Sequence, residues 1–456
     1  MKALTRRTRE LMLLLCSAGL LLLMLFSLEM SQGRPLSTEM LYLVGGFAGV
    51  YAIAHVAISL LAPYADQTML PVVATLNAIG LVIIYRLDLA ERPGYGPLAE
   101  RQVLWSLVGV VLMVLTLAIV RDHKSLTRYS YLLGILGLVL LALPLVWPQP
   151  PGYEEARIWL WLGPFSIQPG EFSKILLLIF FAQLLAQKRA LFTVAGKRFF
   201  GLTFPRLRDL APILAVWAIA ILIMAISNDF GPALLLFATV LGMVYFATGR
   251  TTWLLIGVGL VALGGYAVYQ VSSKIQERVS NFIDPLDNYD TSGYQPSQAL
   301  FGLSWGGLTG TGLGYGHPEL VPVAHSDYIL AAIGEELGLI GLASVLILFA
   351  ILVTAGFRAA LQVRDTYGKL LAAGLSTTVA IQIFVVAGGI SAMLPMTGLT
   401  TPFMSAGGSS IMANYILLGL LLRISNSANR PSEFDADAMS KMPRGARRLR
   451  REKVGA

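Results

Sequence analysis

Long apolar runs are the feature that most constrains how this chain can fold. Each run is about as long as the roughly 20 residues that a helix needs to cross a bilayer, and most Lys and Arg residues lie between the runs. Only helices and closed barrels satisfy their backbone inside lipid, so the pattern predicts an all-α polytopic membrane protein. We expect twelve spanning helices, near residues 11–27, 41–62, 69–87, 103–120, 130–147, 172–187, 211–226, 231–248, 252–272, 328–356, 370–390 and 407–422.

The composition agrees with this class. Hydrophobic residues make up 56% and charged residues 13% of the 456 residues, against roughly 45–50% and 25% in soluble domains. These values exclude a soluble enzyme, a disordered scaffold and a nucleic-acid-binding protein. The chain has four His residues and a single Cys, Cys16, which leaves no internal disulfide and too few ligands for a structural zinc site.

Basic residues predict the orientation in the membrane. With the N-terminus inside, 26 of the 34 Lys and Arg residues fall in inward segments and seven in outward ones, while Lys174 lies within a predicted helix. The positive-inside rule therefore predicts that both termini are cytoplasmic. We interpret the first run as an uncleaved helix rather than a signal peptide, because it exceeds the usual core of about 7–15 residues and no small-residue cleavage site follows it.

Three segments between or after the helices are more than short turns. Segment 188–210 is basic, and we expect it to lie against anionic headgroups on the cytoplasmic side. Segment 273–327 is the only large outward connection and carries six acidic residues against two basic ones; long ordered loops often hold functional residues. The Arg-rich tail from Ser425 is expected to be disordered and juxtamembrane.

A first cluster of polar residues lies within 154–174. Arg157 occurs there beside two Trp residues, and Gln168, Glu171 and Lys174 fall at the expected start of a helix. Glu171 and Lys174 are three residues apart, so they share a helix face and can form an ion pair. An aromatic belt with an anchoring ion pair at the membrane surface explains the same residues without any catalytic role.

Two further clusters follow. The turn SNDFGPALL contains Asp229, which is either functional or a cap for the next helix. The outward segment holds Asp284, Asp287 and Asp290 beside a Gly-Tyr-Gln turn, and then the run GTGLGYG. That run lacks the third glycine and the strand–helix unit of a dinucleotide fingerprint, so it predicts a flexible or closely packed loop.

An acidic pair, Glu335 and Glu336, falls one turn into the helix that follows the outward segment. Ionisable residues at that depth indicate a functional site, and the alternative is a pair at the interface that caps against segment 273–327. Both interpretations remain open from the sequence.

Several motifs together resemble the SEDS glycosyltransferases (FtsW, RodA and SpoVE). The resemblance covers about residues 69–424 and rests on LGPFSIQPGEFSK, NDFGPALL, SGYQPSQALF with GGLTGTGLG, HSDYILAAIGEELGLIG and LPMTGLTTPFMSAGGSSIMANY. It implies a ten-span core, preceded by an additional helix pair in 1–68 and followed by the tail 425–456. We favour the RodA branch over the FtsW branch.

The resemblance implies a reaction. Such proteins polymerise lipid II into peptidoglycan strands at the outer face of the cytoplasmic membrane: the 4-hydroxyl of one lipid-linked disaccharide attacks the anomeric carbon of another and expels undecaprenyl pyrophosphate. A sugar hydroxyl needs a general base, and a carboxylate suits that role. The leaving pyrophosphate needs positive charge, and the sequence leaves open whether a divalent cation such as Mg²⁺ or Mn²⁺ contributes to it.

The family's essential aspartate does not align with an aspartate in this chain. In the family it lies seven residues before the glutamine of the Gly-Tyr-Gln motif and three after a proline, and both spacings reach Asn288 here. An asparagine cannot accept the proton. We therefore predict Asp287 as the base, with Asp290 next and Asp284 third.

Ten residues are predicted to contact the substrate. Arg157 and Lys174 would hold the pyrophosphate, and Glu171 would orient Lys174. The full set is Arg157, Gln168, Glu171, Lys174, Gln295, Gln298, His325, Asp327, Glu335 and Glu336.

A precursor flippase is the alternative function. A flippase needs a cavity that alternates between the two sides, with charge near the midplane for an anionic substrate, whereas the ionisable residues here gather at the outer interface. A pure scaffold would not explain the acidic loop. The resemblance also implies a partner, a class B penicillin-binding transpeptidase, at the late helices and the outer loop, where small residues in 370–392 permit close helix approach.

Overall fold

The computed structural model describes residues 7–34, 37–90, 97–150, 157–163, 165–193, 198–199, 202–203 and 207–431, with side chains left out between 189 and 213. Most of segment 188–210 and nearly all of the tail lie outside the described side chains or outside these residues altogether. The headgroup contact predicted for segment 188–210 and the disorder predicted for residues 432–456 therefore stay predictions. The disorder predicted from Ser425 onward is wrong for residues 425–429, which are the last turn of α14 (Gly408–Asn429).

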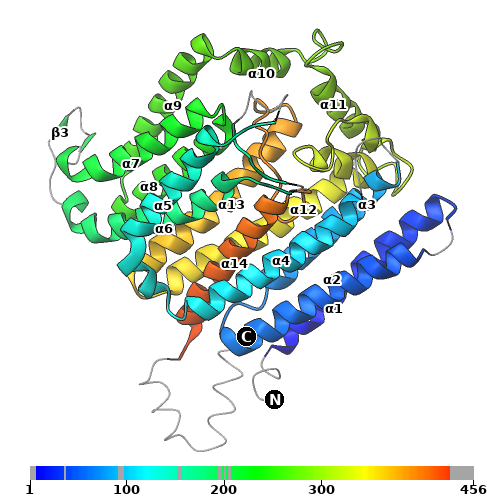
Figure 1. The fold of residues 1–456 in the computed structure, drawn as a ribbon, viewed down its shortest axis with the longest axis horizontal. Helices are drawn as coiled ribbons and strands as arrows, with labels where there is room; N and C mark the ends of the chain where they lie inside the picture. Colours follow the sequence, from blue (N-terminus) through cyan, green and yellow to red (C-terminus); the bar gives the residue numbers. More distant parts are fainter. Residues whose placement is uncertain are drawn as a thin grey trace, which may run out of the picture.

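A helix occurs at each of the twelve predicted runs (Figure 1). Among the described residues, eleven helices are long and apolar enough to span a membrane, and α7 contributes a shorter apolar stretch, Leu214–Ile226. The helices are α1 (Thr8–Ser31), α2 (Thr38–Leu61), α3 (Met69–Asp88), α4 (Leu98–Ile119), α5 (Leu126–Val146), α6 (Pro169–Thr193), α7 (Leu207–Ile226), α8 (Phe230–Thr248), α9 (Thr252–Val271), α12 (Ile329–Gln362), α13 (Thr366–Ile390) and α14 (Gly408–Asn429).

The connections contain the remaining elements. Segment 273–327, expected as a loop, contains two α-helices: α10 is amphipathic and α11 packs on α12. Two short antiparallel hairpins lie in other connections. These elements are η2 (His123–Ser125), β1 (Leu160–Leu162), β2 (Phe165–Ile167), β3 (Arg198–Phe199), β4 (Leu202–Thr203), α10 (Ser273–Ile283), α11 (Tyr294–Gly306) and η3 (Pro318–Leu320).

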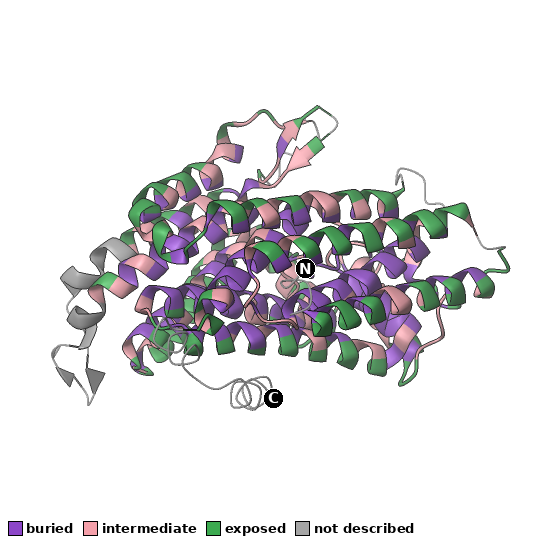
Figure 2. Ribbon diagram, turned by 90° about the horizontal axis from the view of Figure 1, so that it is seen from below, coloured by how far each residue is buried: buried purple, intermediate pink, exposed green. Residues whose placement is uncertain are grey.

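Burial separates central helices from peripheral ones (Figure 2). Helices α3, α13 and α14 are buried along most of their length, whereas α9 exposes nearly its whole surface. In Figure 1, α9, α10 and α11 run along one edge of the bundle and the pair α1–α2 lies at another edge beside α3 and α4. We call the end of the bundle that carries residues 272–328 the loop end, and the opposite end the tail end.

Helix α12 is broken at Gly338, and the glycine-rich run fills the break. Gly338 has a positive φ of 67°, and the backbone of residues 307–312 lies against it. The amides of Thr311 and Gly312 donate to the carbonyls of Glu335 and Glu336, while the amides of Leu339 and Ile340 donate to the carbonyls of Gly307 and Leu308. The run is therefore a closely packed loop that satisfies the backbone groups freed by the broken helix, as irregular backbone at membrane depth requires.

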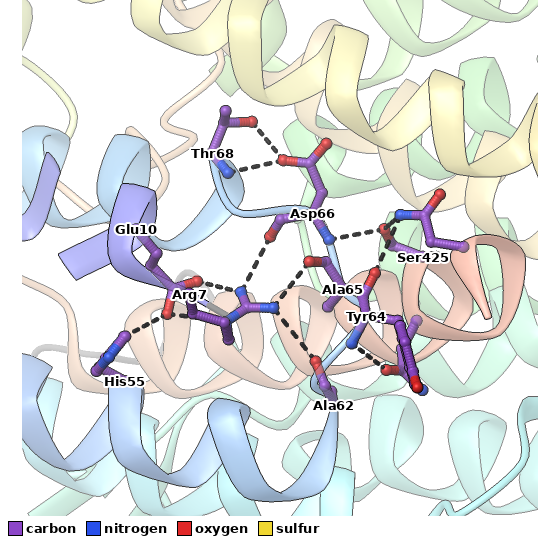
Figure 3. A network of polar contacts seen from close by, with 11 residues as sticks. Arg7, Glu10, His55, Ala62, Tyr64, Ala65, Asp66, Thr68 and Ser425 are labelled. Carbon is purple, nitrogen blue, oxygen red and sulfur yellow. Dashed lines mark hydrogen bonds and ion pairs between the residues drawn. The ribbon is translucent and has the colours of Figure 1, made fainter. Parts of the chain in front are cut away.

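The additional helix pair is fixed to the core at the tail end by a buried ionic cluster (Figure 3). Arg7 pairs with Glu10, whose other partner is the His55 imidazole at 2.6 Å. The Arg7 guanidinium also donates to the carbonyls of Ala62 and Ala65 in the α2–α3 connection, at 3.3 and 2.8 Å. Helix α14 holds the same connection from its other side through Ser425 and Asn426.

At the loop end, α1 reaches the glycine-rich run. The Gln32 side chain donates to the carbonyl of Gly314 at 2.5 Å, and Gly314 has a φ of 86°. A side chain at that position would meet Ser31, Gln32 and Leu28 of α1 and the turn after it. The pair α1–α2 is thus bonded to the core at both ends rather than attached loosely to its side.

Candidate functional site

The candidate site begins with an ion pair at the start of α6. Glu171 and Lys174 form the predicted pair, with Nζ and Oε2 2.5 Å apart. Both side chains are largely buried, at 7% and 12% exposure, so the pair is shielded from bulk water and is stronger than a surface pair. Together with Gln168 and Asp229 they line a small pocket between α6 and α8.

Asp229 precedes α8 and faces this pair. It occupies the N-cap position but its side chain makes no capping hydrogen bond, so the interpretation of Asp229 as a helix cap is wrong. Burial, together with the negative charge of Glu171, raises the pKa of Asp229 to about 7, although the positive charges of Lys274 and Arg278 lower it. The Asp229 carboxyl group is therefore influenced by both a negative charge, Glu171, and two positive charges, Lys274 and Arg278.

Arg278, on α10, provides the basic side of the cluster. Its guanidinium donates to the Thr397 carbonyl at 3.2 Å, and burial lowers its pKa while Asp229 and Asp327 raise it. Burial also raises the pKa of Asp327, to about 6. The charges of Asp229 and Asp327, from two segments that are far apart in the sequence, thus act on one guanidinium.

Two hollows meet at Arg278. The first is a cavity of about 160 Å³, which we call the Arg278 cavity; Arg278, Asn281, Gln295 and Asp327 line it with apolar neighbours. The second is an apolar groove of about 930 Å³ between α7, α8, α9 and α10. Arg278 lines both. A polar cavity and an apolar groove joined at a cation suit a lipid with an anionic headgroup.

The three predicted aspartates lie on the turn between α10 and α11, at the rim of the Arg278 cavity. All three are exposed. The Asp284 carboxylate accepts hydrogen bonds from the amides of Leu286 and Asp287, at 3.1 and 3.2 Å, which makes it a turn-forming residue. In the described part of the chain, the side chains of Asp287 and Asp290 accept no hydrogen bond. Both are available to a substrate.

Asn288, at the family's acidic position, has a structural role. Its amide nitrogen donates to Ser280 Oγ at 3.0 Å and to the Asp284 carbonyl at 3.4 Å, and its carbonyl accepts from Thr291 and Gly293. Gly293 has to be glycine, since a Cβ there would overlap the backbone of Pro285 and Asn288. The side chain at 288 is thus turned back onto α10.

Glu335 and Glu336 lie beside the break in α12 rather than at the Arg278 cavity. Glu336 pairs with Arg86 of α3, with 2.9 Å between Oε1 and Nε, and Glu335 accepts from the His317 amide at 2.5 Å. Arg86 also donates to the Gly316 carbonyl at 2.8 Å. The acidic pair therefore anchors residues 310–317, so the capping interpretation describes its geometry.

The other predicted substrate residues are divided among several places. Gln168 lines the pocket around Glu171, and the Gln295 amide donates to the Pro322 carbonyl at the Arg278 cavity. Gln298 donates to the Tyr289 hydroxyl, and Arg157 is exposed and donates to the Leu145 carbonyl at 3.4 Å. His325 lines a different cavity, between α2, α3 and α4.

Sequence reasoning missed Arg278 as the residue that joins the clusters. Its signal was weak: a single arginine in an amphipathic segment, six residues before Asp284. Nothing in its local sequence pattern indicates that it interacts electrostatically with Asp229 and Asp327. Arg86, the partner of Glu336, was also counted only as a basic residue at the end of a helix.

Comparison with known proteins places the chain. The FtsW/RodA/SpoVE family model, described as "Cell cycle protein", matches residues 66–430. The chain belongs to this family. Among curated relatives, it is 48% identical to the peptidoglycan glycosyltransferase RodA of Mycobacterium leprae over 94% of this chain and 92% of that protein. It is 32% identical to the stage V sporulation protein E of Bacillus subtilis over 72% and 86% of the two chains.

Solved structures agree with the family fold. A chain from a peptidoglycan synthase complex, described as coordinating polymerisation and crosslinking, matches with a TM-score of 0.64 and 26% identity. The crystal structure of Thermus thermophilus RodA matches with a TM-score of 0.58 and 25% identity. Both cover 80% of this chain and nearly all of their own length.

Proposed function

We propose that this protein is a RodA-type peptidoglycan glycosyltransferase that polymerises lipid II, with its loop end at the outer face of the cytoplasmic membrane and both termini inside. The position of Arg278 carries the proposal, because one guanidinium lines both the apolar groove and the polar cavity. A prenyl chain in the groove would place its pyrophosphate at this cation and its sugars toward the cavity. The names of the relatives and the excess of basic residues at the tail end support the same assignment.

The positive charges in the site complement the negative charge of the leaving pyrophosphate. The pyrophosphate gains negative charge as the bond to the anomeric carbon breaks, so fixed cations lower the barrier. Arg278 is the first such cation and Lys174, held by Glu171, the second. We assign the pyrophosphate to these two basic side chains, and a divalent cation such as Mg²⁺ or Mn²⁺ stays a further candidate for the same role.

The proton of the attacking 4-hydroxyl goes to a carboxylate on the turn after α10. Asp287 is the proposed base: it is exposed, its carboxylate accepts no hydrogen bond from the residues that the structure describes, and it lies on the turn whose Pro285 and Ser292 line the Arg278 cavity. A base that is open in the free enzyme is expected to engage only when the substrate is bound. Asp327 lines the same cavity as Arg278, and its negative charge favours the charged form of the guanidinium.

Glycan-strand formation from purified lipid II tests the function. We expect the wild-type protein to produce strands, Lys174→Ala to lose most of that rate, and Lys174→Arg to retain more, because Arg keeps the charge with altered geometry. Equal, full activity of both variants would make Lys174 a structural anchor. Transport of lipid II across a vesicle without strand formation would instead support the flippase.

A transpeptidase of the class B penicillin-binding type is the proposed partner. The late helices offer apolar surface to it: on α12, Ile340, Ile347 and Ile351 are exposed on one helical face. We expect the purified pair to polymerise lipid II faster than this protein alone. No change in rate, with no co-purification in detergent, would contradict the pairing.

A further inference from the structure

A second polar cavity lies at the loop end, apart from the Arg278 cavity. It has a volume of about 480 Å³, within the range of small-molecule sites. One wall is the start of α2 with Glu39 and Leu43, and the other walls are the ends of α3 and α4 and the segment 319–325. We call it the Glu39 cavity. Its α2 wall belongs to the helix pair that precedes the family match at residue 66.

The Glu39 cavity and the Arg278 cavity share a wall. Val321, Ala324 and His325 line the first, whereas Asp327 and Tyr328 line the second. The two sets of lining residues come from one segment of consecutive turns, residues 321–328. This segment is held in place, since the Ala406 amide donates to the His325 carbonyl at 2.8 Å and the Ser405 hydroxyl donates to the Ser326 carbonyl at 2.5 Å.

The lining of the Glu39 cavity is strongly acidic. Glu39, Asp88, Glu100 and Glu319 contribute carboxylates, and Arg34 is the only Lys or Arg among the described lining residues. Glu319 is neutralised by Arg86, and Asp88 accepts the amides of Leu98 and Ala99 at the start of α4.

The carboxylates of Glu39 and Glu100 remain available. Neither forms a hydrogen bond or an ion pair with a residue that the structure describes, and both are exposed at the cavity. Between them the walls are apolar, with Leu43, Leu98 and Val321. An alkyl chain that ends in an ammonium group fits both the walls and the charges.

We propose that the Glu39 cavity binds the free amino group of the stem peptide carried by the saccharide substrate. This rests on the proposed function, because the sugars at the Arg278 cavity would bring their attached peptide to the shared wall. Glu39 and Glu100 pair with the ammonium group and the apolar walls pack on its alkyl stem. The additional helix pair thus supplies part of a substrate-binding site.

The test compares two substrates in the full-length protein. One is lipid II with its stem-peptide amine free, and the other is the same lipid II with that amine acetylated. For the wild type we expect acetylation to raise KM about five-fold with little change in kcat, the size of effect that a partly exposed ion pair gives. The double variant Glu39→Gln/Glu100→Gln should show the raised KM with both substrates.

The four measurements form a cycle that isolates the contact. The increases in KM caused by losing the amine and by losing the carboxylates should not add, because each change removes the same interaction. Equal KM for the two substrates in the wild type would overturn the proposal, as would discrimination that persists in the double variant. Absence of strands from either substrate with the wild type would instead contradict the proposed function. Both substitutions are at exposed side chains, so folding should be unaffected.

Discussion

Asn288 has a structural role at the position where the family resemblance predicts an aspartate. Its amide donates to Ser280 and to the carbonyl of Asp284, so it closes the turn between α10 and α11. A carboxylate at 288 could still accept from the Ser280 hydroxyl but would repel the Asp284 carbonyl. The chain thus has an amide where the turn needs a donor and carboxylates on either side of it.

The first prediction concerns the base. Asp287→Asn should lower the rate of lipid II polymerisation by roughly 10²–10⁴, the usual contribution of a general base, whereas Asp290→Asn should show a smaller loss. In the Asp287→Asn background, Asn288→Asp should restore part of the rate because it returns a carboxylate to the family's spacing. Normal rates for both single variants would place the base elsewhere, and Asp327 would be tested next.

The second prediction uses the raised pKa of Asp229. Its pKa is about 7 in the folded protein against an ordinary value of 3.8, so the folded state holds this proton more tightly than the unfolded state. The contribution of Asp229 to stability is therefore fully present below about pH 4 and is lost as the pH rises through 7. Asp229→Asn should raise the thermal midpoint at pH 8 relative to wild type and change it little at pH 4. The same shift at both pH values would contradict this titration.

Local pairs could be predicted at the residue scale, and distant ones could not. Glu171 and Lys174 were expected to pair because helical geometry fixes which side chains share a face. The electrostatic interaction of Arg278 with Asp229 and Asp327 depends on how α8, α10 and α12 are placed relative to one another, which no local pattern encodes. The pairing of Glu336 with Arg86 could not be predicted for the same reason, because it depends on the relative placement of α3 and α12.

At the scale of elements, hydrophobic length predicted the helices well. All twelve apolar runs are helices, because a segment inside lipid has to satisfy its own backbone. The helices α10 and α11 were not expected, since they are short, and the hydrophobic length that located the others does not apply to them. The break in α12 was also missed, because Gly338 lies within a continuous apolar run.

The third prediction tests the packed glycine-rich run. Gly310 has a φ of 85°, and a Cβ there would overlap the backbone of Glu336 and Leu337. Gly310→Ala should therefore lower the free energy of unfolding by about 1–3 kcal/mol. The matched control is Gly259→Ala on α9, where a Cβ meets nothing within 4 Å and helix propensity should improve. Thermal unfolding in detergent measures both; equal midpoints would contradict the packing argument.

For the whole molecule, the distribution of basic residues and the positions of the sites favour the same membrane topology. The candidate site, the Glu39 cavity and the acidic turn all lie at the loop end. The buried ionic cluster around Arg7 lies at the tail end with Ser425 and Asn426. If the loop end is outside, the substrate sites face the compartment where the strands are laid down, and the basic connections face the cytoplasm as the positive-inside rule requires.

The fourth prediction tests that topology by labelling. In a Cys16→Ala background, a cysteine at Ser304 on α11 should react with an impermeant thiol reagent added to intact cells, and one at Ser427 on α14 should not. Both positions are exposed, so access rather than burial decides the outcome. Permeabilised cells, in which both should react, provide the control. Labelling of Ser427→Cys alone in intact cells would show that the orientation in the membrane is the reverse of the one proposed.

The break in α12 has a kinetic consequence. Residues 307–312 and 335–340 exchange backbone hydrogen bonds in both directions, so neither segment can open while the other stays closed. Their amides should lose protection against hydrogen exchange together, at a single rate, even though one segment is a loop and the other a helix. Because Gln32 bonds Gly314 next to this joint, that shared opening should be slower in the intact protein than in Gln32→Ala.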